Sequence, residues 1–207
     1  PDAAAAAKNS AAAENIRIGD KVYFLVGRMA PKQEQGSVAE FVSVHPCHLA
    51  SVPPSLNMER AAATPLCLVT AYQALQAVGY DDEGCGKGKS IVINGASGGV
   101  GHFAVQLCKH VYQFDHVAAV CSNRNADFIR DLGADAFVDY EITAELSKSR
   151  SPVGGEKYDV GFDLVGGDPV CVPCGTCCGC ANSDPKARSV NTVRSITKSS
   201  CSGGAVV

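Results

Sequence analysis

Short apolar runs alternate with helical patterns through the middle of the chain. Residues 90–93 (Ser-Ile-Val-Ile) predict a buried strand, and a glycine-rich turn at 95–101 follows it. Beyond the turn, apolar residues recur at helical spacing from Val100 to Val111. Strand, glycine turn and helix in this order are typical of a phosphate-binding turn, which presents backbone N–H groups and the positive end of the helix dipole to an anion.

The same alternation continues toward the C-terminus. Three further apolar runs, at 116–121, 136–140 and 158–165, predict strands. A helix over 126–132, closed by Gly133, separates the first two. This pattern predicts an α/β fold with a parallel sheet and right-handed crossovers. A doubly wound dinucleotide domain has about six strands, so four make it incomplete. In the order 3-2-1-4 the fourth strand would lie at an open edge, and we expect such a chain to aggregate.

The first 60 residues have a different pattern. Residues 1–13 are of low complexity, rich in alanine, and bury too little apolar surface to fold. Residues 18–24 predict a turn entering a strand, and the alternation over 36–44 predicts a second strand. Pro53 and Pro54 end the regular structure. Short strands punctuated by glycine and proline predict part of a small β-barrel.

A helical segment joins these two parts. Ser55 or Asn57 is the predicted cap of a helix over 61–63. Thr64-Pro65 is expected to interrupt it, and residues 66–78 predict a second helix. The polar, glycine-rich segment that follows, 81–89, predicts a loop leading into the central strand.

Composition and charge narrow the class of protein. The chain is 46% hydrophobic and 19% charged, as in ordinary soluble globular proteins. A net charge of −3 gives no reason to expect nucleic acid or an anionic membrane as a partner. No apolar run approaches the roughly 18 residues of a membrane span.

The cysteines fall into two groups. Five are scattered singly through the first 170 residues and six lie between Cys171 and Cys201, an odd total of 11 that argues against a closed disulfide framework. Scattered thiols favour a reducing intracellular compartment, either the cytoplasm or an organelle such as a chloroplast or mitochondrion. The tail itself, 168–207, has no strand or helix period, and we predict that it is irregular.

The glycine turn departs from the usual dinucleotide fingerprint G-x-G-x-x-G. Ala96 stands at the first glycine position, whereas Gly98 would let a pyrophosphate approach the backbone and Gly101 would let helix and strand pack closely. The plain alternative, a tight turn found in any α/β protein, stays open on these residues alone.

Several motifs occur in order between about Ile18 and Gly167. They are Gly19-Asp20-Lys21-Val22, Gly36-Ser37-Val38-Ala39-Glu40-Phe41, Ala61-Ala62-Ala63, Thr70-Ala71-Tyr72-Gln73-Ala74-Leu75, Gly95 to Gly101, Leu132-Gly133-Ala134-Asp135 and Phe162-Asp163-Leu164-Val165-Gly166-Gly167. In this ordered set the sequence resembles the quinone oxidoreductase (zinc-independent) branch of the medium-chain dehydrogenase/reductase superfamily. The resemblance implies a GroES-like catalytic domain, here a remnant over 14–60, followed by an incomplete Rossmann domain over 61–167.

The resemblance also implies an activity. Members of the family transfer hydride from NADPH to quinones, enones or other activated alkenes, and a complete member can form a homodimer. Relative to the family, several tens of residues before Ile16 are missing, and the cysteine-rich tail replaces the last third of the cofactor domain. A splice variant, a frameshifted gene or a deliberate fragment would look like this. The alternative function is a catalytically inactive product that retains at most nucleotide binding.

The end of the second strand of the parallel sheet, about 20 residues past the glycines, distinguishes NAD from NADP. No carboxylate occurs there before Asp127, and Ser122 and Arg124 suit a 2′-phosphate, so we predict NADP(H). Arg124 could instead be a solvated residue at a helix start. By resemblance, Thr70 contacts the nicotinamide side and Tyr140 lies near the adenosine phosphate; no catalytic residue is assigned. The predicted cofactor-binding residues are Thr70, Ala96, Ser97, Gly98, Gly99, Val100, Gly101, Ser122, Asn123, Arg124, Tyr140 and Val165.

No metal site is predicted. The segment from Asp20 to Gly36, where zinc-dependent relatives carry a four-cysteine lobe, contains no cysteine. Cys67 lies near a zinc ligand of the alcohol dehydrogenases but one residue out of register, and we interpret it as a core thiol. The spacing from Cys171 to Cys180 approaches zinc and iron–sulfur patterns, which leaves a small metal-binding module as a third hypothesis, although an accidental reading frame is favoured. The five histidines are interpreted as structural or surface residues.

Overall fold

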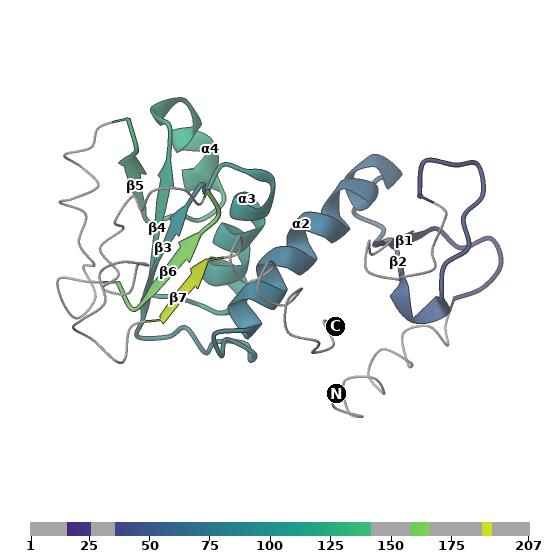
Figure 1. Ribbon diagram of the computed structural model, residues 1–207, viewed down its shortest axis with the longest axis horizontal. Coiled ribbons are helices and arrows are strands. Elements are labelled where there is room, and N and C mark those ends of the chain that lie inside the picture. The colour runs from purple at the N-terminus through teal and green to yellow at the C-terminus, as the bar shows by residue number, and fades with distance from the viewer. Residues whose placement is uncertain (1–15, 26–35, 142–157, 166–187, 192–207) are drawn as a thin grey trace. The chain divides into compact units, whose positions relative to one another are not determined.

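The computed structural model describes residues 16–25, 36–141, 158–165 and 188–191 (Figure 1). The chain divides into two compact units, Pro1–Leu66 and Cys67–Val207. The predicted domain limits 1–13, 14–60, 61–167 and 168–207 stay predictions.

The first unit contains a two-stranded antiparallel sheet. Strand β1 (Val22–Phe24) pairs with β2 (Leu49–Ser51), and the short helix η1 (Pro46–His48) leads into β2. The strand predicted over 36–44 is wrong, because these residues are irregular and the side chains of Val38 and Phe41 are exposed. Apolar alternation alone does not make a strand, because a strand also needs a neighbouring strand that pairs with its backbone, and the two sheets of the described residues do not include this segment.

Helix α2 (Met58–Gln76) is one continuous helix, so the predicted interruption at Thr64-Pro65 is wrong. Of the two candidate caps, Asn57 is the one used: its Oδ1 accepts a hydrogen bond of 2.9 Å from the backbone N–H of Arg60. A proline inside a helix costs about 3 kcal/mol. Ala61 and Pro65, four residues apart on one face, are both buried, so burial of this face offsets part of that cost.

The second unit is built on a parallel sheet of five strands: β3 (Ser90–Asn94), β4 (His116–Cys121), β5 (Ala136–Asp139), β6 (Val160–Asp163) and β7 (Arg188–Asn191). Their order in the sheet is β5-β4-β3-β6-β7 (Figure 1). The central strand β3 has β4 and then β5 on one side, and β6 and then β7 on the other. This confirms the predicted α/β architecture and the predicted order of the first four strands.

Strand β7 corrects two expectations. The tail was predicted to hold no strand, and β6 was predicted to lie at an open edge, but Arg188–Asn191 pairs in parallel with β6 from Val160 to Asp163. The sequence Arg-Ser-Val-Asn has no apolar pattern that would predict a strand. Its backbone joins the sheet by pairing with that of β6. Strand β6 is therefore paired on both sides, so aggregation through an unpaired β6 edge is no longer expected.

Three helical segments accompany the sheet. Helix α3 (Gly99–Gln106) continues into the π-helical turn η2 (Leu107–Val111), where Tyr112 N–H donates to the Leu107 carbonyl over 2.9 Å. Helix α4 (Ala126–Asp131) follows the 3-10 turn η3 (Asn123–Asn125). As predicted, Gly133 closes α4, with a φ of +106° that favours glycine.

The core has two layers, one on each face of the sheet. On one face Ile91 and Ile93 pack with Ala104 and Val105 of α3, and Leu75 of α2 belongs to the same cluster. On the other face Val92 packs in a separate cluster, together with Ala118, Val120, Val138 and Tyr158. Strand β3 is thus buried on both sides, as its unbroken apolar run predicts.

A side-chain clamp holds β6 to β3 at their amino ends. Oδ2 of Asp159 accepts two hydrogen bonds of 2.8 Å, one from the backbone N–H of Ser90 and one from its hydroxyl. The Asp159 N–H in turn donates to the Ser90 carbonyl over 3.1 Å. The clamp fixes the register that brings the carboxyl ends of both strands level.

Candidate cofactor site

The turn after β3 is held against β4 by one carbonyl. The Val120 oxygen accepts hydrogen bonds of 3.1 Å from the N–H groups of both Gly95 and Ala96. Gly95 has a φ of +77°, so it provides the left-handed residue that a tight turn needs, and Ala96 is fully buried. The alanine at the first fingerprint position is therefore compatible with the turn, because the preceding glycine makes the bend.

The two later glycines serve different purposes. A Cβ at Gly101 would lie 2.2 Å from the Gly95 carbonyl oxygen and 2.6 Å from that of Ala96, so helix and turn pack too closely for any side chain. At Gly98, which is exposed, the nearest atom to an added Cβ is the Gly95 oxygen at 3.2 Å. Packing explains Gly101, whereas the open side of Gly98 leaves room for a ligand against the backbone.

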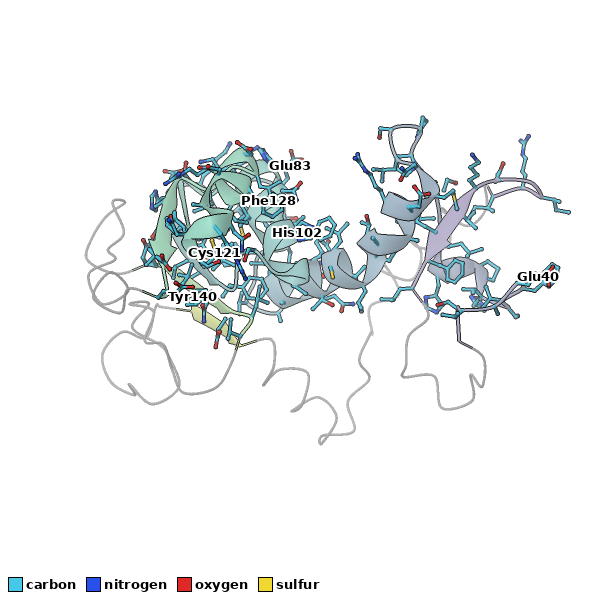
Figure 2. The ribbon with its side chains drawn as sticks, turned by 90° about the horizontal axis from the view of Figure 1, so that it is seen from above. Glu40, Glu83, His102, Cys121, Phe128 and Tyr140 are labelled. Atoms are coloured by element: carbon cyan, nitrogen blue, oxygen red, sulfur yellow. The ribbon has the colours of Figure 1, made fainter. Side chains whose placement is uncertain are left out.

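The first turn of α3 begins at Gly98 without a side-chain cap. The Gly98 carbonyl accepts from the backbone N–H of His102 at 3.1 Å and from its Nδ1 at 2.9 Å. The imidazole also packs on Phe103 and, from α4, on Phe128, with ring centroids 4.2 Å and 6.3 Å apart; Figure 2 shows His102 beside Phe128. His102 thus anchors the start of α3, and among the described residues no side-chain cap occupies the helix start.

The end of β4 meets the glycine turn through a polar cluster. Asn125 Nδ2 donates to Ser97 Oγ over 3.1 Å and to Ser122 Oγ over 3.3 Å. The Ser122 side chain is buried, at 4% exposure, whereas Asn123 and Arg124 are exposed. The structure therefore brings Ser97 and Ser122 together, and the following two residues extend into solvent.

The end of β6 lies on the opposite side of the turn. The Leu164 N–H donates to the Asn94 carbonyl over 3.2 Å, and Asn94 Nδ2 donates to Asp163 Oδ1 over 2.9 Å. A Cβ at Gly95 would lie 2.9 Å from Val165 Cγ2, so Val165 borders the turn directly. Its side chain is 63% exposed, an apolar surface beside the glycines.

Strand β4 ends in the buried thiol of Cys121, and strand β5 ends in the buried carboxyl group of Asp139. Burial raises the pKa of the Cys121 thiol, and the nearby Asp139 carboxylate raises it further. Asp139 Oδ1 accepts from the Glu141 N–H over 3.0 Å, which turns the chain outward at Tyr140. Tyr140 is 48% exposed at this end of the sheet, and Figure 2 labels it together with Cys121.

Cys67 of helix α2 lies against the start of α3. A Cβ at Gly99 would lie 2.9 Å from Cys67 Sγ, so Gly99 lets the thiol pack against the turn. Thr70 lies three residues further along α2, one turn beyond Cys67. This contact accounts for Cys67 as a packing residue beside the glycines.

Several residues build this edge although no sequence motif marks them individually. Asn94 and Asp163 end neighbouring strands, and polar residues at the carboxyl ends of parallel strands were a usable signal. Asn125 gave no such signal, since it follows two other polar residues at a helix start. Gly95 was noted only as part of the turn.

Among the described residues, no three His, Cys, Asp or Glu side chains lie close enough together to hold a metal ion. Cys67, Cys85, Cys108 and Cys121 are free thiols. The cysteines from Cys171 to Cys180 lie outside the described residues, so a metal site there and the prediction of none both stay untested. Within the part of the chain that the structure describes, no helix combines the length and the apolar character needed to cross a membrane.

Comparisons with known proteins agree with this architecture. The family profile "Zinc-binding dehydrogenase" matches residues 99–174. The "Chloroplast envelope quinone oxidoreductase homolog" of Arabidopsis thaliana is 38% identical over 160 residues, which cover 77% of this chain and 46% of that protein. The "NADPH-dependent alkenal/one oxidoreductase, chloroplastic" of the same plant is 36% identical over 162 residues, 77% of this chain and 39% of the relative.

A solved structure shows the same likeness. The quinone oxidoreductase from Coxiella burnetii superimposes with a TM-score of 0.59 at 32% sequence identity, covering 74% of this chain and 44% of that one. The chain thus spans less than half the length of each of these relatives. The motif order, the parallel sheet and these matches together place the chain in the quinone oxidoreductase-like branch of the medium-chain dehydrogenase/reductase superfamily.

Proposed function

We propose that this chain binds NADP(H) along the carboxyl edge of β3, β4 and β6, and that it takes part in reducing a quinone, an enone or another activated alkene. The single observation that carries the proposal is the glycine turn. It joins a buried strand to a helix start that carries no side-chain cap among the described residues, and Gly98 at that start is exposed.

The pyrophosphate would lie over the first turn of α3. The N–H groups of Gly99 and Val100 supply hydrogen bonds there, and the helix dipole favours the negative charge. Gly98 admits the phosphate oxygens close to the backbone, and the Ser97 hydroxyl borders the same turn. Val165 offers an apolar surface on the other side, and Thr70 on α2 is assigned to the nicotinamide end.

The adenosine end would lie past β4. Between Cys121 and Asp127 there is no carboxylate to repel a 2′-phosphate. Arg124 is exposed and free to turn toward a ligand, and its guanidinium suits a phosphate in a forked geometry. Ser122 and Asn123 add polar contacts, and Tyr140 at the end of β5 is assigned to the adenosine phosphate. These features favour NADP(H) over NAD(H).

The cofactor supplies the hydride when bound, and this chain's residues hold and orient it. No catalytic acid or base is assigned. The two Arabidopsis relatives are named for quinones and for alkenals or enones, which supports a small conjugated carbonyl compound as the substrate class. Their names also place them in the chloroplast; for this chain we propose a reducing intracellular compartment, which its four described free thiols favour.

Fluorescence titration with NADPH and NADH tests the proposal. Wild type is expected to bind NADPH more tightly, and Arg124→Ala to lose about 1.5–3 kcal/mol of NADPH binding with little change for NADH. Arg130→Ala is the matched control, because Arg130 is exposed further along α4 and pairs with Asp127. Equal affinities for both cofactors in wild type would refute the assignment, and binding without turnover of any quinone or enone would favour the inactive, nucleotide-binding alternative.

A further inference from the structure

The side-chain amide of Asn125 joins two segments that belong to different ends of the proposed cofactor. Its Nδ2 donates to Ser97 Oγ over 3.1 Å and to Ser122 Oγ over 3.3 Å. Ser97 lies in the turn after β3, where the pyrophosphate would bind. Ser122 ends β4, where the adenosine ribose would bind.

The chemistry of the amide fixes the direction of both hydrogen bonds. An amide NH2 group has two protons to donate, and a hydroxyl has one proton to donate and two lone pairs to accept with. Because Ser97 and Ser122 each accept from Asn125, each keeps its own proton for another acceptor. An anionic oxygen is such an acceptor.

The backbone holds Asn125 in place for this role. Its N–H donates to the Ser122 carbonyl over 2.9 Å within η3, so the residue is tied to Ser122 by both main chain and side chain. The side chain is half-buried between the turn and the start of α4.

We propose that Asn125 is a positioning residue that orients the hydroxyl protons of Ser97 and Ser122 toward the phosphates of the dinucleotide and so favours a 2′-phosphorylated ribose. This inference rests on the proposed function. Asn125 touches neither phosphate; it acts through the two serines.

Replacing Asn125 by the isosteric aspartate reverses the direction of its hydrogen bonds to the two serines. In Asn125→Asp the carboxylate has no proton to donate and accepts from both serines, so their protons point inward and a negative charge is added beside the site. In Asn125→Ala both serines lose their donor and no charge is added. A comparison of the two variants therefore separates hydroxyl orientation from charge repulsion.

Calorimetric titration of the full chain with two fragments of the cofactor tests each end separately. The probes are adenosine 2′,5′-bisphosphate for the ribose end and ADP for the pyrophosphate turn. Asn125→Ala is expected to weaken both probes by about threefold to tenfold, the effect of one ordinary hydrogen bond each. Asn125→Asp is expected to weaken the bisphosphate by about tenfold more, because like charges add to the lost donors. The ratio of NADPH to NADH affinity falls in both variants.

Controls keep the test specific. Gln113→Glu makes the same amide-to-acid change at the amino side of β4 and is expected to bind as wild type does. In a double-mutant cycle, Ser122→Ala should remove most of the effect of Asn125→Ala on the bisphosphate. Circular dichroism verifies the fold of each variant, and Asn125→Ala serves alone if Asn125→Asp unfolds.

Three results would overturn the inference: wild-type affinities in both Asn125 variants, a loss confined to Asn125→Asp, or additive effects of Asn125→Ala and Ser122→Ala. Any of these, with NADPH still preferred by wild type, refutes the role of Asn125 and leaves the proposed function standing. A wild type that binds neither NADPH nor either probe refutes the proposed function itself.

Discussion

Asn94 and Asp163 form a hydrogen bond that ties the carboxyl end of β3 to that of β6. Nδ2 of Asn94 donates to Oδ1 of Asp163 over 2.9 Å, and the same oxygen accepts from the Val165 N–H over 3.1 Å. Asn94 is 7% exposed, so water cannot readily replace the acid as its partner. One carboxylate oxygen therefore holds both the strand pair and the segment that borders the glycine turn.

Removing this acceptor should destabilise the sheet. Asp163→Ala leaves a buried amide without its acceptor and is expected to lower the free energy of unfolding by about 1–3 kcal/mol. Asp163→Asn keeps an oxygen at the same position and should lose much less. Denaturant titration measures both variants, and equal losses would contradict the importance of the acceptor.

Two glycines of the turn should separate stability from binding. Gly101→Ala puts a methyl group 2.2 Å from the Gly95 carbonyl oxygen, and we expect impaired folding. Gly98→Val places a branched side chain where the pyrophosphate would meet the backbone, and we expect NADPH binding to be lost with little change in fold. Thermal unfolding and cofactor titration measure the two effects. If Gly98→Val bound NADPH normally, the turn would be only structural.

His116 should make stability depend on pH. Burial lowers its pKa below the ordinary 6.5, against a smaller opposite effect from Asp135. The unfolded chain then binds the proton more readily, so stability is lost as pH falls through about 6.5. The ring also stacks on Tyr158, with centroids 6.2 Å apart. His116→Gln should therefore show a shallower decline in stability from about pH 7 to pH 5; an unchanged slope would contradict this origin.

The described thiols should differ in reactivity. Burial raises the pKa of Cys108, with Cys85 as a smaller cause, and burial also raises the pKa of Cys121. The thiolate is the nucleophile, so both should resist iodoacetamide in the native protein. Cys67 and Cys85 are less buried and should react first. Peptide mass spectrometry measures the order, and early alkylation of Cys108 would show that this core opens.

The protein should contain less than a stoichiometric amount of zinc. The segment from Asp20 to Gly36 has no cysteine, and the described residues form no metal cluster. We expect less than one equivalent of zinc by elemental analysis and unchanged NADPH binding after treatment with a chelator. Bound zinc that is lost together with NADPH binding would overturn the prediction and direct attention to Cys171–Cys180.

The sequence predicted the parallel sheet because buried strands need no external cue. In β3 every residue is buried, and its apolar run marks it at once. Strand β7 has no such apolar run, because pairing with β6 places it in the sheet. Residues 36–44 alternate, but they belong to neither sheet of the described part of the chain. The helix break expected at Pro65 does not occur either. The face that carries Pro65 is buried, and local helix propensity contains no information about such burial.

Some residues of the candidate site could likewise be predicted from the sequence, and others could not. Gly98, Gly101 and Ser122 follow from their positions after strands, because a motif fixes spacing along the chain. Asn125 could not be found in this way. Its interest lies in side-chain contacts to Ser97, 28 residues earlier in the sequence, which only folded geometry brings together.

The clamp between Ser90 and Asp159 spans 69 residues of sequence. Closing so long a loop costs conformational entropy before any contact repays it, which slows folding. The proposed cofactor-binding edge would be complete only once β6 has paired with β3. A dinucleotide that binds this edge would stabilise the assembled chain by mass action, so cofactor supply in the cell would set how much newly made protein survives.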